Sequence, residues 1–223
     1  MSSKRLPMKM LKSINNKLLL DRVYCQVKKV KSIKKIIVAT STNTKDDMIF
    51  NFCKKNEIEI FRGPLNDVSK RFIEILEIHK PNYFVRINGD SPFILPSIIV
   101  KGIDLFENNN VDLVTNIFPR SFPKGLSVEI IRSKKFIESY PFQNALQKEH
   151  VTNFFYKNFK HYKIKNFKLP INCNDLSLSV DTYHDLLNIR KISKIFDNNE
   201  LNIEELINLT RRVQYLKNVK KEI

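Results

Sequence analysis

The chain has 223 residues, of which 42% are hydrophobic and 28% charged, and this length and composition suit one globular domain with a buried core. No apolar run approaches the roughly 18–20 residues that a membrane-spanning helix needs. Residues 1–17 are basic and lack the apolar stretch and small-residue cleavage site of a secretory signal. We therefore expect a cytoplasmic protein in which residues 1–223 form a single domain.

The net charge is strongly positive, because 39 Lys and Arg residues stand against 23 Asp and Glu residues and give a formal +16. Nucleic acid, an anionic membrane or a polyanionic small substrate could each attract such a chain. No nucleic-acid-binding fingerprint accompanies the charge, and the aromatic residues, mainly Phe, follow the spacing of a core. We interpret most of the charge as solvated surface with one anion site as a second contribution, and we predict no nucleic-acid partner.

The three cysteines, Cys25, Cys53 and Cys173, are widely spaced and form neither a C-x-x-C pair nor a Cys/His cluster at zinc-ligand spacing. We expect them to be reduced and mostly buried thiols.

Strand and helix patterns alternate along the chain, and most strands are short runs that are apolar on both faces. In chain order, we predict strands at residues 36–39, 58–61, 83–87, 112–115, 128–131 and 176–180. We predict helices at residues 45–55, 67–79, 97–108 and 149–158, with two more that begin at Thr182 and Asn202. Buried strands separated by helices indicate βαβ units, so we expect an α/β fold with a mostly parallel sheet.

In such a sheet the ligand lies beyond the carboxyl ends of the strands, and polar residues follow several predicted strands. Gly89 permits close approach of the backbone to a ligand, and Asp90 is suited to bind Mg²⁺ through oxygen. A simple turn explains residues 88–92 equally well. Asp181 also follows a predicted strand, where it either stabilises a helix N-terminus or shares one magnesium ion with Asp90.

The N-terminal residues 2–11 contain two hydroxyls, three cations and a proline. Hydroxyl groups and backbone N–H groups there could bind triphosphate oxygens while Arg5 and Lys9 neutralise charge. Composition alone favours the alternative of a frayed basic terminus.

The string Ser3-x-Arg5-Leu-Pro-x-Lys9-x-Leu11 resembles the opening signature of cytidylyltransferases that make CMP-sugars, above all the spore-coat-polysaccharide branch. The branch is related to the 3-deoxy-manno-octulosonate and acylneuraminate enzymes. Further segments match in order, at residues 38–47, 61–71, 85–92, 122–129, 149–152 and 179–182. The extension at residues 202–221 adds nothing to the match.

The resemblance implies a Rossmann-like nucleotide-diphospho-sugar transferase fold. In the family an apolar strand precedes the signature loop, so the first family strand is expected to be missing here. The relatives also imply a homodimer.

The resemblance implies roles for the matching positions. For catalysis these are Arg5, Lys9, Asp90 and Asp181, of which Arg5 and Lys9 bind the phosphates, aided by Ser3. For Mg²⁺ they are Asp90 and Asp181, with Gly89 beside them. For ribose or cytosine they are Arg71 and the backbone of Ala39 and Thr40, and for the acceptor sugar they are Lys124, Gly125, Glu129 and His150.

The implied reaction is transfer of CMP from CTP to a sugar or sugar acid, with release of pyrophosphate. Two departures from the family pattern, Lys124 and Ser127, stand where acidic residues are common and suggest an anionic acceptor. Three alternatives remain: a glycosyltransferase of the related fold, an inactive nucleotide- or sugar-binding protein, and a basic nucleic-acid-binding module. The first typically needs an Asp-x-Asp motif, which the chain lacks.

Overall fold

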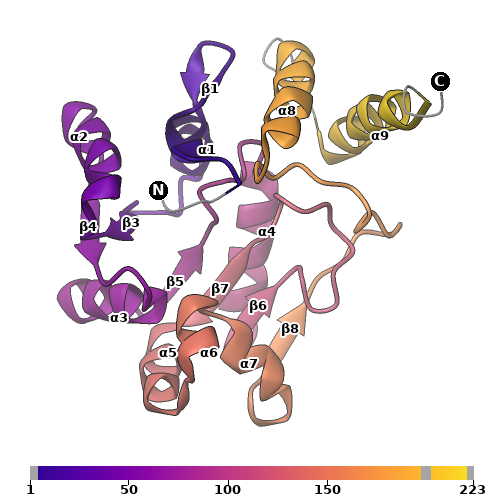
Figure 1. Ribbon diagram of the computed structural model, residues 1–223. Helices are drawn as coiled ribbons and strands as arrows, with labels where there is room; N and C mark the ends of the chain where they lie inside the picture. The colour runs from indigo at the N-terminus through magenta and orange to yellow at the C-terminus, as the bar shows by residue number, and fades with distance from the viewer. Residues whose placement is uncertain (1–4, 197–201, 220–223) are drawn as a thin grey trace.

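The computed structural model describes residues 5–196 and 202–219, and Figure 1 shows their arrangement. The chain opens with a 3₁₀ turn, Lys9–Leu11, and a short hairpin formed by β1 (Ser13–Ile14) and β2 (Lys17–Leu18). The hairpin leads directly into α1 (Leu19–Lys28). The sequence analysis predicted no element in this part of the chain.

A parallel pair of strands comes next, formed by β3 (Val38–Ser41) and β4 (Ile60–Gly63). A 3₁₀ turn (Thr44–Asp46) and α2 (Asp47–Lys55) make the crossover between them. Both strands begin two residues later than predicted, so that Thr40 and Ser41 belong to β3 and not to the loop that follows it. The βαβ unit expected here is therefore confirmed, and the polar residues Thr40 and Ser41 form the end of its first strand.

A second sheet has four strands in the order β5 (Tyr83–Arg86), β7 (Glu129–Arg132), β6 (Leu113–Thr115) and β8 (Ile164–Asn166). The strand β7 runs antiparallel to both of its neighbours, whereas β6 and β8 are parallel. Three of the four strands therefore share one direction, as predicted, but β7 opposes them. The prediction of one central sheet needs correction, because β3 and β4 form a separate sheet to one side (Figure 1).

Helices cover both sheets. They are α3 (Val68–His79), α4 (Pro96–Glu107), α5 (Ser133–Ser139), α6 (Ala145–Glu149), α7 (Asn153–Lys157), α8 (Tyr183–Phe196) and α9 (Ile203–Val219). The helix predicted to begin at residue 67 is capped there: the Asp67 carboxylate accepts the Lys70 amide at 2.8 Å and so satisfies a free N–H at the start of α3. No helix in the described ranges has the length and apolar character needed to cross a bilayer.

Two predicted elements are wrong. The helix expected at 149–158 is broken, because α6 ends at Glu149 and the Asn153 amide turns back to the His150 carbonyl at 2.7 Å before α7 begins. Residues 176–180 form no strand and make only a single bridge, at Ser177. Their backbone groups bond instead to two loops, since Leu178 donates to the carbonyl of Lys124.

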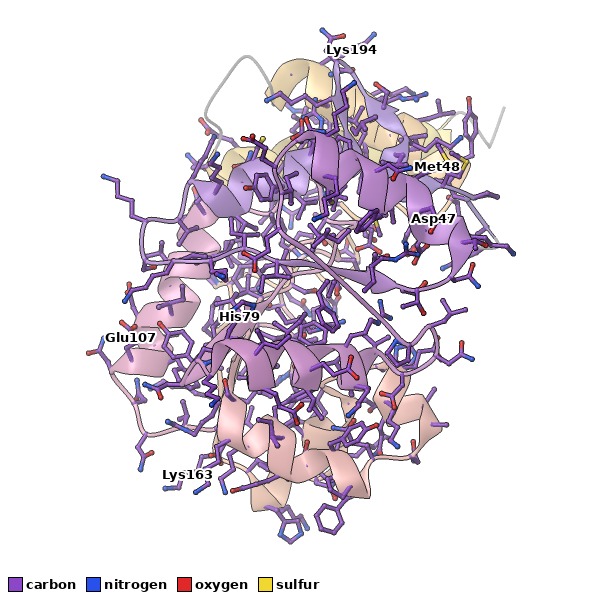
Figure 2. All side chains as sticks on the ribbon, turned by 90° about the vertical axis from the view of Figure 1, so that its left-hand side faces the viewer. Asp47, Met48, His79, Glu107, Lys163 and Lys194 are labelled. Atoms are coloured by element: carbon purple, nitrogen blue, oxygen red, sulfur yellow. The ribbon has the colours of Figure 1, made fainter. Side chains whose placement is uncertain are left out.

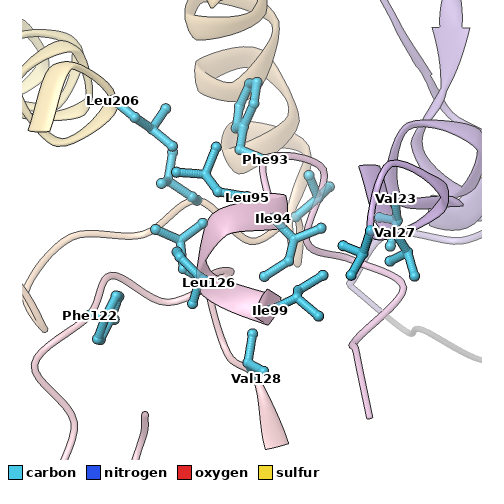
Figure 3. Packing of buried hydrophobic residues seen from close by; sticks show 14 of the residues in the cluster. Val23, Val27, Phe93, Ile94, Leu95, Ile99, Phe122, Leu126, Val128 and Leu206 are labelled. Carbon is cyan, nitrogen blue, oxygen red and sulfur yellow. The ribbon is translucent and has the colours of Figure 1, made fainter. Parts of the chain in front are cut away.

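The main core lies where α1, α4 and the C-terminal helices meet the four-stranded sheet (Figure 3). Val23 and Val27 from α1 pack near Ile99 of α4, while Leu206 of α9 closes the cluster from the other side. Burying each such side chain stabilises the fold by about 1.5–3 kcal/mol. The core therefore ties the N-terminal and C-terminal segments to the same framework.

Candidate active site

Lys9 stands at the centre of a cluster of charged residues from three distant segments. Its ammonium donates to the Asp90 carboxylate at 2.8 Å and to the Asp181 carboxylate at 3.0 Å, and also to the Val180 carbonyl at 3.2 Å. The Arg5 guanidinium lies 3.6 Å from the same Asp181 carboxylate. The structure thus brings together all four residues predicted to be catalytic.

The backbone holds the two aspartates side by side. The Val180 amide donates to the Asp90 carbonyl at 3.0 Å, which joins residues 88–92 to the segment that precedes α8. Asp185 then fixes the start of α8, because its carboxylate accepts the amide and the hydroxyl of Thr182, both at 2.8 Å. The position of Asp181 is therefore set from both sides.

Two opposing effects act on the Lys9 ammonium. Burial lowers the pKa of Lys9, but the nearby carboxylates of Asp90 and Asp181 outweigh it and raise the pKa above its ordinary value of 10.5. Lys9 is consequently a cation throughout the neutral range.

A cavity of about 990 Å³ opens beside this cluster. Five of the residues predicted to bind the phosphates or the nucleotide line it: Lys9, Ala39, Thr40, Arg71 and Gly89. The cavity extends from the carboxyl ends of β3 and β5 to an end lined by His79 and Glu107. Figure 2 labels these two residues and views the protein from the side that carries β3 and β4. It is large enough for a nucleotide.

The end of β3 is held rigid by the buried carboxylate of Asp46. This carboxylate accepts the Thr40 hydroxyl at 2.8 Å, the Ser41 hydroxyl at 2.6 Å and the Ser41 amide at 3.0 Å. The Arg62 side chain adds a bond to the Ser41 carbonyl at 2.9 Å. A nucleotide that enters the cavity therefore meets a preorganised strand end.

Arg71 lines this cavity, and its buried Nε has no hydrogen-bond partner among the described residues. Burial lowers the pKa of the guanidinium, and Asp67 partly opposes that effect. The stem of Arg71 passes so close to β4 that a Cβ added at Gly63 would lie 2.6 Å from the Arg71 Cγ. Gly63 thus makes room for Arg71, a relation that the sequence analysis missed.

The two aspartates are the residues that could hold a magnesium ion. Within the described residues there is no group of three or more His, Cys, Asp or Glu side chains at metal-binding positions. Asp90 and Asp181 nevertheless converge on one cation, the Lys9 ammonium, and both offer oxygen donors. Two carboxylates together with substrate phosphates form a donor set that suits Mg²⁺, so these residues fit the metal chemically.

The residues predicted for the acceptor differ widely in their exposure. Lys124 and His150 are exposed, whereas Glu129 is fully buried. The Glu129 carboxylate accepts Arg86 at 2.5 Å and the Tyr156 hydroxyl. Burial, followed by the charge of Glu129, raises the pKa of Tyr156 strongly. The prediction that Glu129 faces a sugar is therefore corrected: its carboxylate is a buried ion-pair partner.

Gly125 has a structural role beside the site. Its φ of +91° is a conformation that only glycine adopts without strain, and a Cβ there would lie 2.5 Å from the Leu178 carbonyl carbon. Gly125 lets this loop press against the backbone of residues 178–179, just before Asp181.

Ser127 accepts hydrogen bonds from both terminal nitrogens of the Arg120 guanidinium, at 3.2 Å each. Burial lowers the pKa of Arg120, with Glu129 and Tyr156 opposing that effect. Arg120 was not among the predicted site residues. Ser3, which was, lies outside the described residues.

Comparison with known proteins shows the family to which the chain belongs. A family model described as cytidylyltransferase matches residues 1–221. The chain belongs to the cytidylyltransferase family. It is 27% identical to the spore coat polysaccharide biosynthesis protein SpsF of Bacillus subtilis, over 95% of this chain and 91% of that protein. It is 28% identical to an uncharacterized protein of Methanocaldococcus jannaschii, over 99% of this chain and 91% of that protein.

A 3-deoxy-manno-octulosonate cytidylyltransferase of Rickettsia felis is 31% identical over 52% of this chain and 48% of that enzyme. Among solved structures, a cytidylyltransferase of Leptospira borgpetersenii aligns with a TM-score of 0.87 and 24% identity, over 98% of this chain and 92% of that one. A CMP-2-keto-3-deoxy-manno-octonic acid synthetase complexed with CTP aligns with a TM-score of 0.65 and 15% identity, over 87% and 95%. These alignments confirm the predicted Rossmann-like nucleotidyltransferase fold of this cytidylyltransferase.

Proposed function

We propose that this cytidylyltransferase uses CTP and Mg²⁺ to transfer CMP to a sugar or sugar acid, for synthesis of a surface polysaccharide or another glycan. The observation that carries the proposal is the meeting of Arg5, Lys9, Asp90 and Asp181 at the mouth of a cavity lined by Thr40 and Arg71. Family membership and the CTP complex of a structural relative support the choice of nucleotide.

In the proposed reaction an acceptor hydroxyl oxygen bonds to the α-phosphorus of CTP. The bond from that phosphorus to the oxygen that bridges to the β-phosphate breaks, pyrophosphate leaves, and the hydroxyl proton passes to solvent. Arg5 and Lys9 neutralise the charge that develops on the leaving pyrophosphate. Because Arg5 is mostly exposed, it can turn toward a bound triphosphate without breaking other packing.

The carboxylates of Asp90 and Asp181 would hold the metal when nucleotide binds, and Mg²⁺ there supplies charge neutralisation on the phosphate oxygens. In the described structure the Lys9 ammonium neutralises these two carboxylates. Lys9 is therefore positioned to leave the aspartates for the triphosphate.

The Arg71 guanidinium is the group we assign to the ribose or cytosine, because Arg71 lines the cavity. The backbone of Ala39 and Thr40, held by Asp46, would also contact the nucleotide.

We propose an anionic acceptor. Arg120 is half-buried and bonds to the neutral hydroxyl of Ser127, and Lys124 is exposed on the same loop. A carboxylate or phosphate on the acceptor would complement these cations. An acceptor panel in which neutral sugars are used faster than anionic ones would contradict this choice.

The deciding experiment measures pyrophosphate release from CTP, ATP, UTP and GTP with a library of acceptors. Asp90→Asn should abolish CTP-dependent release because it removes one of the two converging carboxylates. The matched control is Asp104→Asn, an exposed position on α4. Release that is independent of CTP, or that Asp90→Asn leaves unchanged, would overturn the proposed function.

A further inference from the structure

An extended segment at residues 176–180 leads from the C-terminal part of the fold to the active-site cluster. The Leu178 amide donates to the Lys124 carbonyl at 2.7 Å. In addition, the Gln214 side chain of α9 donates to the Ser177 carbonyl at 3.2 Å. The segment is therefore fixed by two distant parts of the chain, although it forms no strand.

The side chains of this segment alternate between the core and the surface. Its apolar members are all buried: Leu176, Leu178 and Val180. The serines between them, Ser177 and Ser179, are partly exposed, and their hydroxyl oxygens lie 3.3 Å apart. Lys124 is exposed and is bridged to Ser177 in parallel register, so both side chains belong to the same face. We refer to Ser177, Ser179 and Lys124 as the polar row.

Gly125 sets the spacing within the polar row. A Cβ at Gly125 would lie 2.5 Å from the Leu178 carbonyl carbon and 2.6 Å from the Ser179 amide nitrogen. Only glycine lets the loop that carries Lys124 come this close to the two serines. The distance between the lysine and the hydroxyl pair is therefore fixed by backbone contacts.

The polar row lies next to the charged cluster but outside the nucleotide cavity. The Lys9 ammonium donates to the Val180 carbonyl at 3.2 Å, and the Val180 amide donates to the Asp90 carbonyl at 3.0 Å. Ser179 directly precedes Val180, so the row ends beside both contacts. Among the described residues that line the cavity, Lys9 is present but none comes from residues 176–181.

The proposed reaction needs a second binding surface in this position. In an in-line displacement the attacking oxygen approaches the phosphorus from the side opposite the leaving group. The acceptor therefore cannot occupy the space that the nucleotide fills, and it must reach the α-phosphorus from beside Asp90 and Asp181. The polar row provides a surface there.

The chemistry of the polar row indicates the class of ligand. Serine hydroxyls donate and accept hydrogen bonds, as the hydroxyls of a sugar do. The ammonium of Lys124 pairs with a carboxylate or a phosphate. A ligand that carries several hydroxyls and one anionic group matches all three side chains.

We propose that Ser177, Ser179 and Lys124 form the subsite for the acceptor, with the serines bonded to its hydroxyls and the lysine to its anionic group. This inference rests on the proposed function, because it assigns the surface that receives the acceptor of CMP. It identifies that acceptor as a polyhydroxylated acid.

The test uses two probes that differ in one group, glucuronate and glucose. Each is titrated into the complete chain without nucleotide, and the backbone amide resonances of residues 177–179 are followed by NMR. We expect glucuronate to shift these resonances with a Kd at least about fivefold lower than that of glucose. Lys124→Met should make the two Kd values equal.

Variants of the serines test the hydroxyls. Ser177→Ala with Ser179→Ala should weaken glucuronate binding roughly tenfold, because two hydrogen bonds are lost. Ser177→Thr with Ser179→Thr keeps both hydroxyls and should retain the affinity. Ser97→Ala, at an exposed position on α4, is the control and should change nothing. Equal binding of the two probes by the wild type, or unchanged binding by the double alanine variant, would overturn the proposal.

Kinetics separate this subsite from a role in supporting Asp181. With the anionic acceptor that supports the fastest pyrophosphate release, the double alanine variant should raise the KM for the acceptor and leave the KM for CTP unchanged. An equal rise in both KM values would overturn the assignment. Absence of CTP-dependent release in the wild type would contradict the proposed function instead, and the probe titrations would still decide the subsite.

Discussion

Removing the ammonium of Lys9 tests the central cluster most directly. Lys9→Met keeps the length of the side chain but leaves Asp90 and Asp181 without the cation that lies 2.8 and 3.0 Å from them. The side chains of Lys9 and Asp90 are only 14% and 22% exposed, so solvent screens their pair weakly, whereas Asp181 is 39% exposed.

The magnitude follows from these exposures. Breaking a buried charge pair costs about 3–5 kcal/mol, and the partial exposure of Asp181 reduces this to about 2–3 kcal/mol. For a chain of this size the corresponding fall in the melting temperature is about 5–10 °C. Mg²⁺ should then stabilise the Lys9→Met variant more than the wild type, because the metal no longer competes with the ammonium for the two carboxylates.

Urea denaturation with EDTA and with Mg²⁺ measures both effects, and Lys31→Met, at an exposed position, is the control. CTP binding by calorimetry should weaken in the Lys9 variant even as its response to Mg²⁺ grows. If Lys9→Met is as stable as Lys31→Met, or if Mg²⁺ stabilises the variant and the wild type equally, the assignment of Lys9 as the occupant of the metal position is refuted.

Four further outcomes are expected. Burial lowers the pKa of Lys9, but the neighbouring carboxylates outweigh this effect and raise the pKa above 10.5. The stability difference between wild type and Lys9→Met should therefore be constant at neutral pH. It should vanish as the pH rises through the raised pKa of Lys9. Gly63→Ala should displace Arg71, whose Cγ would lie 2.6 Å from the new Cβ, and weaken CTP binding by calorimetry about tenfold. Gly125→Ala should abolish pyrophosphate release, since its Cβ meets rigid backbone at 2.5 Å. Glu129→Ala should lower the free energy of unfolding in urea by about 3–5 kcal/mol, because it leaves a cation unpaired.

The three substitutions other than Lys9→Met each have a control or a result that would contradict them. Glu138→Ala, which removes exposed ion pairs on α5, should leave the free energy of unfolding nearly unchanged, and an equally small effect of Glu129→Ala would contradict its structural role. Gly63→Ala must keep most of its stability, because unaltered CTP affinity in a folded variant would remove Arg71 from the nucleotide site. Full activity of Gly125→Ala would show that residues 178–179 do not position Asp181.

The strands β3 to β7 and the helices α2, α3 and α4 were predictable because each shows a local periodic pattern. The helix α1 was missed although Val23 and Val27 lie on one face, since Arg22 appears in the sequence as a solvated charge. In the structure Arg22 is buried and donates to the Ile14 carbonyl at 3.0 and 2.8 Å. The residues next to an arginine in the sequence do not indicate that it is buried and bonded to a backbone carbonyl.

The site was predictable to the extent that it depends on strand ends and on a recognisable signature. Asp90 and Asp181 were paired as one of the alternatives because each follows a predicted strand, although residues 176–180 form no strand. The burial of Glu129 could not be predicted, because its partners Arg86 and Tyr156 come from other parts of the chain. Likewise, the extended segment at 176–180 resembles a strand locally, but its partners are loops that only the tertiary fold brings near.

The cluster around Lys9 also has a consequence for the order of thermal events. Lys9 is 81 residues from Asp90 and 172 residues from Asp181 along the chain, so these contacts close very long loops. Such closures are entropically costly and depend on the segments between them being in place. On heating, catalytic inactivation should therefore precede the loss of helical circular dichroism, and a sample that looks native by spectroscopy can already have a dispersed catalytic centre.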